Sequence, residues 1–224
     1  MSLKAEQISK RYFRKSGEAN HFFAVRNVSL ELKPGCVTVL MGRSGSGKTT
    51  LLHMLSGLLT PTEGKVWLDE TDLYQLSDDD LSRLRNEKIG VIPQGKSALD
   101  ALTVWENILL PLNLRGSKKE TDAADVWLER LGIAHLRNAM PAELSGGELR
   151  RMAIARALAG TPDILLADEP TGDLDDENTQ LILKLLREEA NRGAAVLIVT
   201  HESGALAYAD NSYRMNEGIL ESIE

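Results

Sequence analysis

A glycine-rich segment with the residues of a phosphate-binding loop lies in the first quarter of the chain. It reads Gly42-Arg43-Ser44-Gly45-Ser46-Gly47-Lys48-Thr49-Thr50. An apolar run, 37–41, precedes it, and apolar residues at helical spacing follow it between positions 51 and 58. The spacing G-x-x-x-x-G-K-[ST] between a strand and a helix is typical of loops whose backbone N–H groups surround phosphate oxygens. The sequence therefore predicts a phosphate site here.

Two side chains of this segment have separate expected roles. We expect Lys48 to reach the outer phosphates and to act in catalysis, and the Thr49 hydroxyl to hold a Mg²⁺ that bridges to phosphate oxygens. The start of the following helix adds unpaired N–H donors and a positive dipole end. The alternative is a glycine-rich turn with an incidental lysine. The complete pattern, in the order strand, turn, helix, favours the phosphate site.

Polar side chains also end three other short apolar runs. Asp168 and Glu169 follow the run 164–167, His201 closely follows 195–199, and Gln94 closely follows 89–92. Carboxyl ends of parallel strands meet at the ligand-binding edge of a sheet. We expect Asp168 to hold the Mg²⁺ beside Thr49 and Glu169 to polarise a water molecule at the γ-phosphate.

The other two strand-end residues have less specific predicted roles. His201 could bond the γ-phosphate or the attacking water, and the Gln94 amide could reach the metal or that water, as part of the catalytic group. The acidic pair could instead cap the turn at Pro170, and a histidine taken alone is more often structural. His21, His53 and His135 receive that structural interpretation.

A second donor-rich helix start has no expected partner within its own chain. The segment is Leu144-Ser145-Gly146-Gly147-Glu148, with Ser145 placed as N-cap and two glycines that expose backbone N–H groups. This predicts a second anion site. The alternative is an ordinary capped helix start, which would not need both glycines.

The wider pattern predicts an α/β fold. Strands that are apolar throughout alternate with helices, which indicates a parallel sheet covered on both faces. We expect one domain over 1–224, with a core of about 1–94 and 160–224 and a helical part of about 95–159. Separate strands are expected at 22–25 and 28–32, and Pro111 should interrupt a helix that begins after Thr103. The acids at 78–80 suit the first turn of a helix capped by Ser77 better than a metal site.

Composition narrows the class of protein. The chain has 224 residues, a net charge of −7 and a pI near 5.3, which argues against a nucleic-acid-binding surface. No apolar run approaches the length of a membrane span, and the first residues contain no apolar signal region. Cys36 is the only cysteine, so an internal disulfide is impossible. These features predict a cytoplasmic protein and do not exclude a membrane-bound partner.

Taken together, the motifs resemble the ATP-binding subunit of an ATP-binding cassette (ABC) transporter from about Tyr12 to the C-terminus. The resemblance covers the phosphate loop, Gln94, the segment 144–148, Asp168 with Glu169, the segment 172–175 and His201. It implies a P-loop NTPase core of RecA type, an antiparallel β subdomain and an inserted helical subdomain. It also implies ATP and Mg²⁺ as ligands, and hydrolysis of ATP.

The resemblance further implies partners and nucleotide contacts. Tyr12 would stack on adenine, and two subunits would meet head to tail around two ATP molecules. Ser145, Gly146, Gly147 and Glu148 of one subunit, together with Asp175, would then face nucleotide held by the other. A separate transmembrane permease would dock on the helical subdomain near Gln94, which places the chain on the inner face of the cell membrane. No nucleic-acid partner is implied.

Within that family the motifs look most like the group of lipoprotein-releasing, macrolide-export and cell-division ATPases. Three positions depart from the usual pattern: Pro93 precedes Gln94 where an aromatic is usual, Glu148 replaces the commonest Gln, and Asp173 replaces a frequent Asn. None removes a catalytic group, so we expect an active ATPase.

Two functions stay open at this stage, and two others are disfavoured. The subunit could energise export or extraction by its permease, or it could gate a partner across the membrane without transport. Soluble DNA-repair or translation ATPases of this family need insertions or a second cassette that are not found here. A GTPase would need a guanine-reading Asn-Lys-x-Asp.

Overall fold

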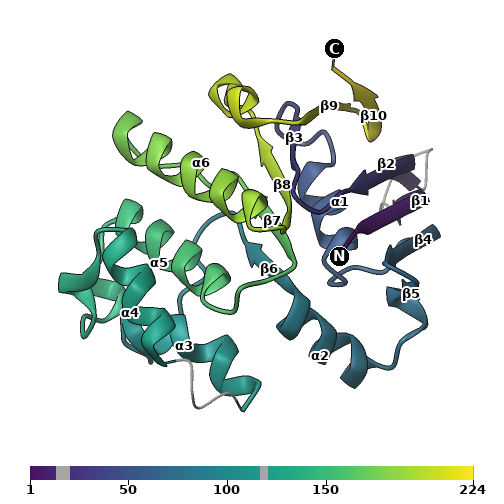
Figure 1. The fold of residues 1–224 in the computed structure, drawn as a ribbon. Coiled ribbons are helices and arrows are strands. Elements are labelled where there is room, and N and C mark those ends of the chain that lie inside the picture. Colours follow the sequence, from purple (N-terminus) through teal and green to yellow (C-terminus); the bar gives the residue numbers. More distant parts are fainter. Residues whose placement is uncertain (14–20, 117–120, 224) are drawn as a thin grey trace.

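A computed structural model describes residues 1–13, 21–116 and 121–223, which form two sheets and a group of helices (Figure 1). The larger sheet has the strand order β10-β9-β3-β8-β7-β6. Its strands are β3 (Val37–Met41), β6 (Ile89–Ile92), β7 (Ile164–Asp168), β8 (Ala195–Thr200), β9 (Asn211–Asn216) and β10 (Ile219–Ser222). All neighbours are parallel except β9 and β10, so the predicted parallel sheet is confirmed.

The smaller sheet is antiparallel, with the order β2-β1-β4-β5. It contains β1 (Leu3–Phe13), β2 (His21–Leu32), β4 (Glu63–Leu68) and β5 (Thr71–Asp72). The expectation of two strands at 22–25 and 28–32 is wrong, because β2 runs through both. Asn27 adopts a left-handed conformation with φ of 46°, and its N–H donates to Ser9 Oγ at 3.0 Å. The irregularity is therefore a bulge, where the pairing register shifts, and the strand does not end there.

Six α-helices complete the part of the chain that is described. They are α1 (Lys48–Leu55), α2 (Asp78–Lys88), α3 (Val104–Leu114), α4 (Thr121–Arg130), α5 (Gly146–Leu158) and α6 (Asp176–Asn191). Four short 3₁₀ turns lie at Leu73–Gln75, Ala134–Leu136, Pro141–Glu143 and Ser203–Tyr208. Ser77 caps α2 as expected, by accepting from the N–H of Asp80. No helix in these described ranges is long and apolar enough to cross a bilayer.

Helix α3 passes through Pro111, so the predicted interruption there is wrong. A proline inside a helix removes one backbone hydrogen bond. The helix continues because its far end is held by packing: Ile108, Leu109 and Leu112 are buried on both sides of the proline. The stabilisation from burying several large side chains exceeds the loss of one bond.

Two apolar clusters hold the layers together, one on each face of the parallel sheet. One includes Leu40 of β3 and joins α1 to the antiparallel sheet. The other includes Val39 of β3 and joins α6 to the helices α3, α4 and α5. Helix α5 packs against both α3 and α4 and also reaches β6. The helices between residues 104 and 158 therefore share an apolar core with the sheet. The boundaries of about 95–159 for a helical subdomain stay a prediction.

Candidate functional site

The phosphate loop connects β3 to α1 and closes tightly on itself. Lys48 Nζ donates to the carbonyl oxygens of Gly42 at 2.7 Å and Arg43 at 3.0 Å, so the ammonium group lies inside the curve of the loop. Gly47 has φ of 107°, and a Cβ there would lie 2.1 Å from the carbonyl oxygen of Ala24. Only glycine fits this position, because both its backbone conformation and its contact with β2 exclude a side chain.

A hydroxyl and a carboxylate meet beside this loop. Thr49 Oγ1 donates to Asp168 Oδ2 at 2.7 Å, which brings the start of α1 to the end of β7. Asp168 is only 2% exposed, and burial raises the pKa of its carboxyl while the bond from Thr49 opposes that rise. Gln94 lines the same cavity. These hard oxygen donors suit Mg²⁺, and a buried carboxylate with no cation bonded to it is the charge that such an ion would balance.

The metal position is not a closed protein cage. No group of three or more His, Cys, Asp or Glu side chains that could hold a metal occurs in the ranges that the structure describes. Mg²⁺ commonly keeps several waters and takes one or two protein ligands together with substrate phosphates. The small donor set around Thr49 and Asp168 therefore fits a Mg²⁺ that arrives with a nucleotide.

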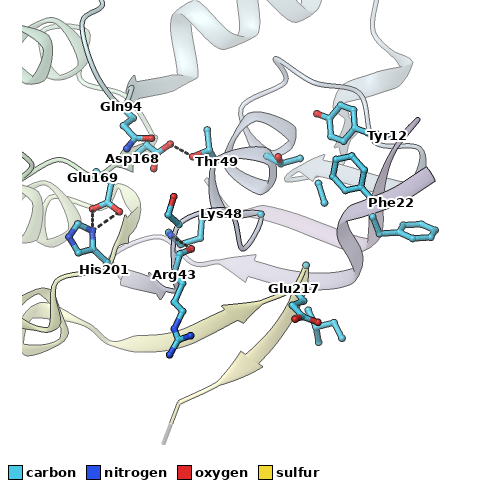
Figure 2. Close-up of a pocket in the computed structure, with 18 of the residues that line it drawn as sticks. Tyr12, Phe22, Arg43, Lys48, Thr49, Gln94, Asp168, Glu169, His201 and Glu217 are labelled. Atoms are coloured by element: carbon cyan, nitrogen blue, oxygen red, sulfur yellow. Dashed lines mark hydrogen bonds and ion pairs between the residues drawn. The ribbon is translucent and has the colours of Figure 1, made fainter. Parts of the chain in front are cut away.

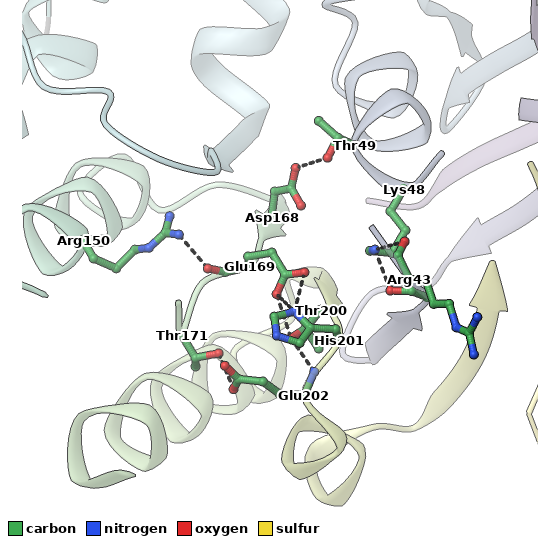
Figure 3. A network of polar contacts seen from close by, with 11 residues as sticks. Arg43, Lys48, Thr49, Arg150, Asp168, Glu169, Thr171, Thr200, His201 and Glu202 are labelled. Carbon is green, nitrogen blue, oxygen red and sulfur yellow. Dashed lines mark hydrogen bonds and ion pairs between the residues drawn. The ribbon is translucent and has the colours of Figure 1, made fainter. Parts of the chain in front are cut away.

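Glu169 lies directly against His201 (Figure 3). His201 Nδ1 is 3.0 Å from Glu169 Oε1 and 3.1 Å from Oε2, and Thr200 Oγ1 donates to Oε2 at 3.1 Å. The hydrogen bond to Glu169 raises the pKa of His201, and the negative charge of the carboxylate adds to the rise. The sequence analysis predicted that both residues lie at the γ-phosphate. The structure brings them together, and they bond to one another.

A cavity of about 1690 Å³ contains this centre (Figure 2). Its lining includes the following residues that the sequence predicted as site residues: Tyr12, Arg43, Ser44, Gly45, Gly47, Lys48, Thr49, Thr50, Gln94, Asp168, Glu169 and His201. Ser46 does not line the cavity, and its carbonyl oxygen accepts from the N–H of Gly218 at 3.0 Å. Gly42 contributes its carbonyl to Lys48.

The aromatic end of the cavity is formed by two rings. Tyr12 and Phe22 are stacked, with ring centroids 5.7 Å apart and an angle of 28° between the planes. Figure 2 shows the two rings on the far side of the phosphate loop from His201. The two rings form a largely apolar surface at this end of the cavity, and the contact of Tyr12 with adenine stays a prediction. Phe22 was missed from the sequence, although its place in an aromatic-rich strand paired with Tyr12 was a usable indication.

Glu217 and Arg150 are among the other lining residues that the sequence analysis missed. Glu217 lies in the turn between β9 and β10, which sequence patterns did not reveal as a hairpin. Arg150 comes from α5, is 8% exposed and donates to backbone carbonyls of the site. A lone arginine in a helix carries no sequence signal for such a position.

The glycine segment before α5 is not part of this cavity. Ser145, Gly146, Gly147 and Glu148 do not line it, and α5 starts at Gly146 with Ser145 as its N-cap. Glu148 Oε2 accepts from Ser145 N at 2.8 Å and from Ser145 Oγ at 2.7 Å. The side-chain hydrogen bond from Ser145 is the main cause that lowers the pKa of Glu148. The predicted N-cap at Ser145 is therefore confirmed, and Glu148 completes a capping box with it. The predicted second anion site stays a prediction.

Asp175 is likewise outside the cavity and caps α6. It accepts from the backbone N–H of Asn178 at 2.8 Å, and this bond is the first cause that lowers the pKa of Asp175. Its expected contact with nucleotide stays a prediction that needs a second subunit.

Comparison with known proteins identifies the family of this site. Residues 25–172 match the model of the family described as ABC transporter. The chain belongs to the ABC transporter family. The lipoprotein-releasing system ATP-binding protein LolD of Shewanella oneidensis is 40% identical over 98% of this chain and 95% of its own. The ABC transporter ATP-binding protein MJ0796 of Methanocaldococcus jannaschii is 38% identical over 99% of this chain and 96% of its own.

Solved structures agree with the sequence comparison. A dimeric structure of the MJ0796 cassette superposes with a TM-score of 0.90 at 34% identity, over 99% of both chains. A second dimeric structure of MJ0796, bound to ADP and Pi after hydrolysis, gives 0.88 at 33% identity over 99% of both. The present chain is an ATP-binding subunit of this family with ATPase activity, and its cofactors are ATP and Mg²⁺. The predicted fold and family resemblance are confirmed.

Proposed function

We propose that this subunit binds Mg-ATP in a head-to-tail dimer and hydrolyses it to drive a separate membrane permease of the export or extraction type. The observation that carries the proposal is the cluster around the phosphate loop, where Lys48, the Thr49–Asp168 pair and the Glu169–His201 pair line one cavity. LolD belongs to a lipoprotein-releasing system and MJ0796 to an ABC transporter, and neither favours a purely regulatory role. We place the subunit on the cytoplasmic face of the membrane, held there by the permease.

The residues divide the chemistry among them. Tyr12 supports the adenine ring, and the loop N–H groups with Lys48 bind the phosphates. Thr49, Asp168 and Gln94 would hold Mg²⁺, which when bound balances charge on the phosphate oxygens. Glu169 accepts a proton from, or polarises, the attacking water. His201 turns from Glu169 toward the γ-phosphate when nucleotide enters, which leaves the carboxylate available to water.

Dimer formation would add a second set of hydrogen-bond donors to this cavity. Ser145, Gly146 and Gly147 form a donor-rich helix start that does not line the cavity of its own subunit. Across a two-fold axis they would meet the γ-phosphate bound by Lys48 of the partner, with Asp175 close by. Each ATP would then bridge two subunits, and the bridge would be lost when the γ-phosphate leaves.

A groove of about 720 Å³ provides the proposed docking site for the permease. Its walls come from the segment after α1 and from α2, β6 and the end of α3. The apolar lining includes Leu58, Ile89, Val91 and Leu114. Leu58 is 56% exposed and Leu114 is 73% exposed, and both line this groove, so together they offer an exposed apolar surface to a partner. Strand β6 leads into Pro93 and Gln94, so an amphipathic cytoplasmic segment of the permease in this groove would lie beside the strand that positions Gln94.

Sedimentation of the purified subunit with nucleotide tests the dimer. The Glu169→Gln variant is expected to be monomeric alone or with ADP and dimeric with Mg-ATP, and addition of Ser145→Arg is expected to abolish the dimer. A dimer of equal strength in ADP, or one indifferent to Ser145→Arg, would show that the segment 144–148 is not the second half of the site.

Co-purification with the co-expressed permease tests the groove. Leu114→Glu places a charge in the apolar wall and is expected to prevent co-purification. Val126→Glu is the matched control, because Val126 is 54% exposed on α4 and lies outside the groove. Loss of co-purification in both variants, or in neither, would argue against this docking site.

A further inference from the structure

Arg150 is a buried residue of the cavity that has no role in the mechanism proposed above. It lies in the second turn of α5, the helix that starts at the glycine segment, and is 8% exposed. Its Nη1 donates to the carbonyl oxygen of Pro93 at 2.6 Å, and its Nη2 donates to that of Glu169 at 2.7 Å (Figure 3 shows the latter). One guanidinium therefore joins the residue before Gln94 to the residue expected to activate water.

The peptide that Arg150 holds is in an unfavourable conformation. Glu169 has φ of 48°, in the left-handed region that non-glycine residues adopt only when surrounding contacts hold them there. Its carbonyl oxygen accepts from Arg150 and also from the N–H of Gly172 at 3.1 Å, while its own N–H donates to Val199 at 2.8 Å. Arg150 thus supplies the one side-chain bond to the Glu169 peptide among these, while Thr200 and His201 hold its carboxylate.

The guanidinium lies close to Gly172 and to several negative charges. A Cβ at Gly172 would lie 3.5 Å from Arg150 Nη2 and 3.4 Å from the Glu169 carbonyl oxygen. Burial lowers the pKa of Arg150, and the negative charges of Asp173, Asp168 and Glu169 oppose that change. Asp173 is one of the departures from the family pattern, and it brings an additional carboxylate to the cluster that Arg150 faces.

We propose that Arg150 is a positioning residue for ATP hydrolysis, which fixes the Glu169 peptide and the Pro93 carbonyl to helix α5. The proposal rests on the proposed role of Glu169. Arg150 leaves phosphate binding to the loop and Lys48, so its removal should slow turnover far more than it weakens Mg-ATP. A guanidinium is needed because its fork of donors spans two carbonyls, whereas a lysine ammonium is a single compact group.

The experiment compares Arg150→Met and Arg150→Lys with wild type in kcat, KM and the Kd for Mg-ATP, with binding measured in the Glu169→Gln background. Displacing a catalytic group by about 1 Å can cost about 10²-fold in rate. We expect Arg150→Met to lose about 10²-fold in kcat with Kd changed less than about threefold. Arg150→Lys retains the charge and one bond, so an intermediate loss is expected.

Arg187→Met is the matched control. Arg187 also joins two elements, since it donates to the carbonyl oxygen of Gly35 at 3.0 Å and pairs with Asp210, but it does not line the cavity. The Arg187→Met variant should have a lower melting temperature than wild type but no selective loss of kcat. The proposal is overturned if the Arg150 variants keep kcat within twofold of wild type, or if their affinity for Mg-ATP falls in proportion to kcat. It is also overturned if their kcat and Kd match those of Arg187→Met. If Arg150→Met does not fold, Arg150→Lys decides.

Two reference measurements separate this proposal from the function on which it rests. An inactive wild type, or a Glu169→Gln variant as active as wild type, would mean that the proposed hydrolysis at Glu169 is wrong. An active wild type, a slow Glu169→Gln and an unaffected Arg150→Met would refute only the role of Arg150.

Discussion

The contact between Glu169 and His201 makes one substitution, Glu169→Gln, testable in both activity and stability. Glutamine has nearly the same shape and can still accept from Thr200, so the fold should be retained. It lacks the charge and the basicity needed to activate water, and loss of a general base typically costs about 10²–10⁴-fold in rate. We therefore expect kcat to fall by that factor while Mg-ATP still binds.

The effect on stability depends on pH, and its sign follows from His201. The folded-state pKa of His201 is raised above its ordinary value of 6.5, chiefly by its hydrogen bond to Glu169. The pair therefore stabilises the fold fully below pH 6.5, and this stabilisation is lost as pH rises through the raised pKa. The His201 side chain is 70% exposed, so solvent screens the pair strongly.

The magnitude is correspondingly small but measurable. A surface ion pair contributes about 0–1 kcal/mol, which in a chain of this length corresponds to at most about 2–4 °C in melting temperature. Melting curves without nucleotide between about pH 5.5 and 8.5 should show that wild type loses up to this amount relative to Glu169→Gln as pH rises. The His201→Gln variant should remove the same pH-dependent difference. A difference that is independent of pH, or one that persists in His201→Gln, would refute the reasoning.

Two further predictions concern residues of the same cavity, and a third concerns Glu148 at the start of α5. Lys48→Ala should abolish hydrolysis and weaken the binding of Mg-ATP, and Tyr12→Ala should weaken the binding of ATP more than that of free triphosphate. Equal ATP affinity of Lys48→Ala and wild type by calorimetry would contradict this. Asp168→Asn removes a buried carboxylate that has no cation bonded to it, so the nucleotide-free protein should melt a few degrees higher (about 2–4 °C per kcal/mol) while Mg²⁺-dependent turnover is lost; a lower melting temperature would contradict it. Glu148→Gln weakens the acceptor that engages the Ser145 hydroxyl and removes a negative charge near the partner's phosphate, so sedimentation should show a tighter ATP dimer in the Glu169→Gln background than with Glu148 intact.

Much of the site could be predicted because strand ends and loop spacing determine where side chains lie. Glycines and Lys48 at fixed spacing give the phosphate loop, and Asp168 must then approach Thr49, because β7 and β3 both lie beside β8 and run in the same direction. The cap at Ser145 was predicted from residue types alone. These parts depend on local geometry and on one topological rule, both of which sequence patterns carry.

The remaining parts depend on long-range contacts that residue spacing does not encode. The pairing of His201 with Glu169 joins two strand ends that are 32 residues apart in the chain. Asn27 is compatible with either a turn or a bulge from its residue type, and the pairing of β2 with β1 makes it part of a bulge. Pro111 usually ends a helix, but buried leucines on both sides of it keep α3 intact. Tertiary packing overrides local preference in both cases.

The position of Arg150 on α5 connects the two halves of the proposed dimer site. Ser145 caps α5, and Arg150 lies one turn beyond the glycines that would meet the partner's γ-phosphate. Because an α-helix moves largely as a rigid element, a displacement of its first turn on dimer formation would also displace the guanidinium. That guanidinium holds the carbonyl oxygens of Pro93 and Glu169. Closing one ATP site would thereby adjust both Gln94 and the water-activating carboxylate of the other, and a monomer, in which α5 has no partner, should hydrolyse ATP slowly even with every catalytic side chain in place.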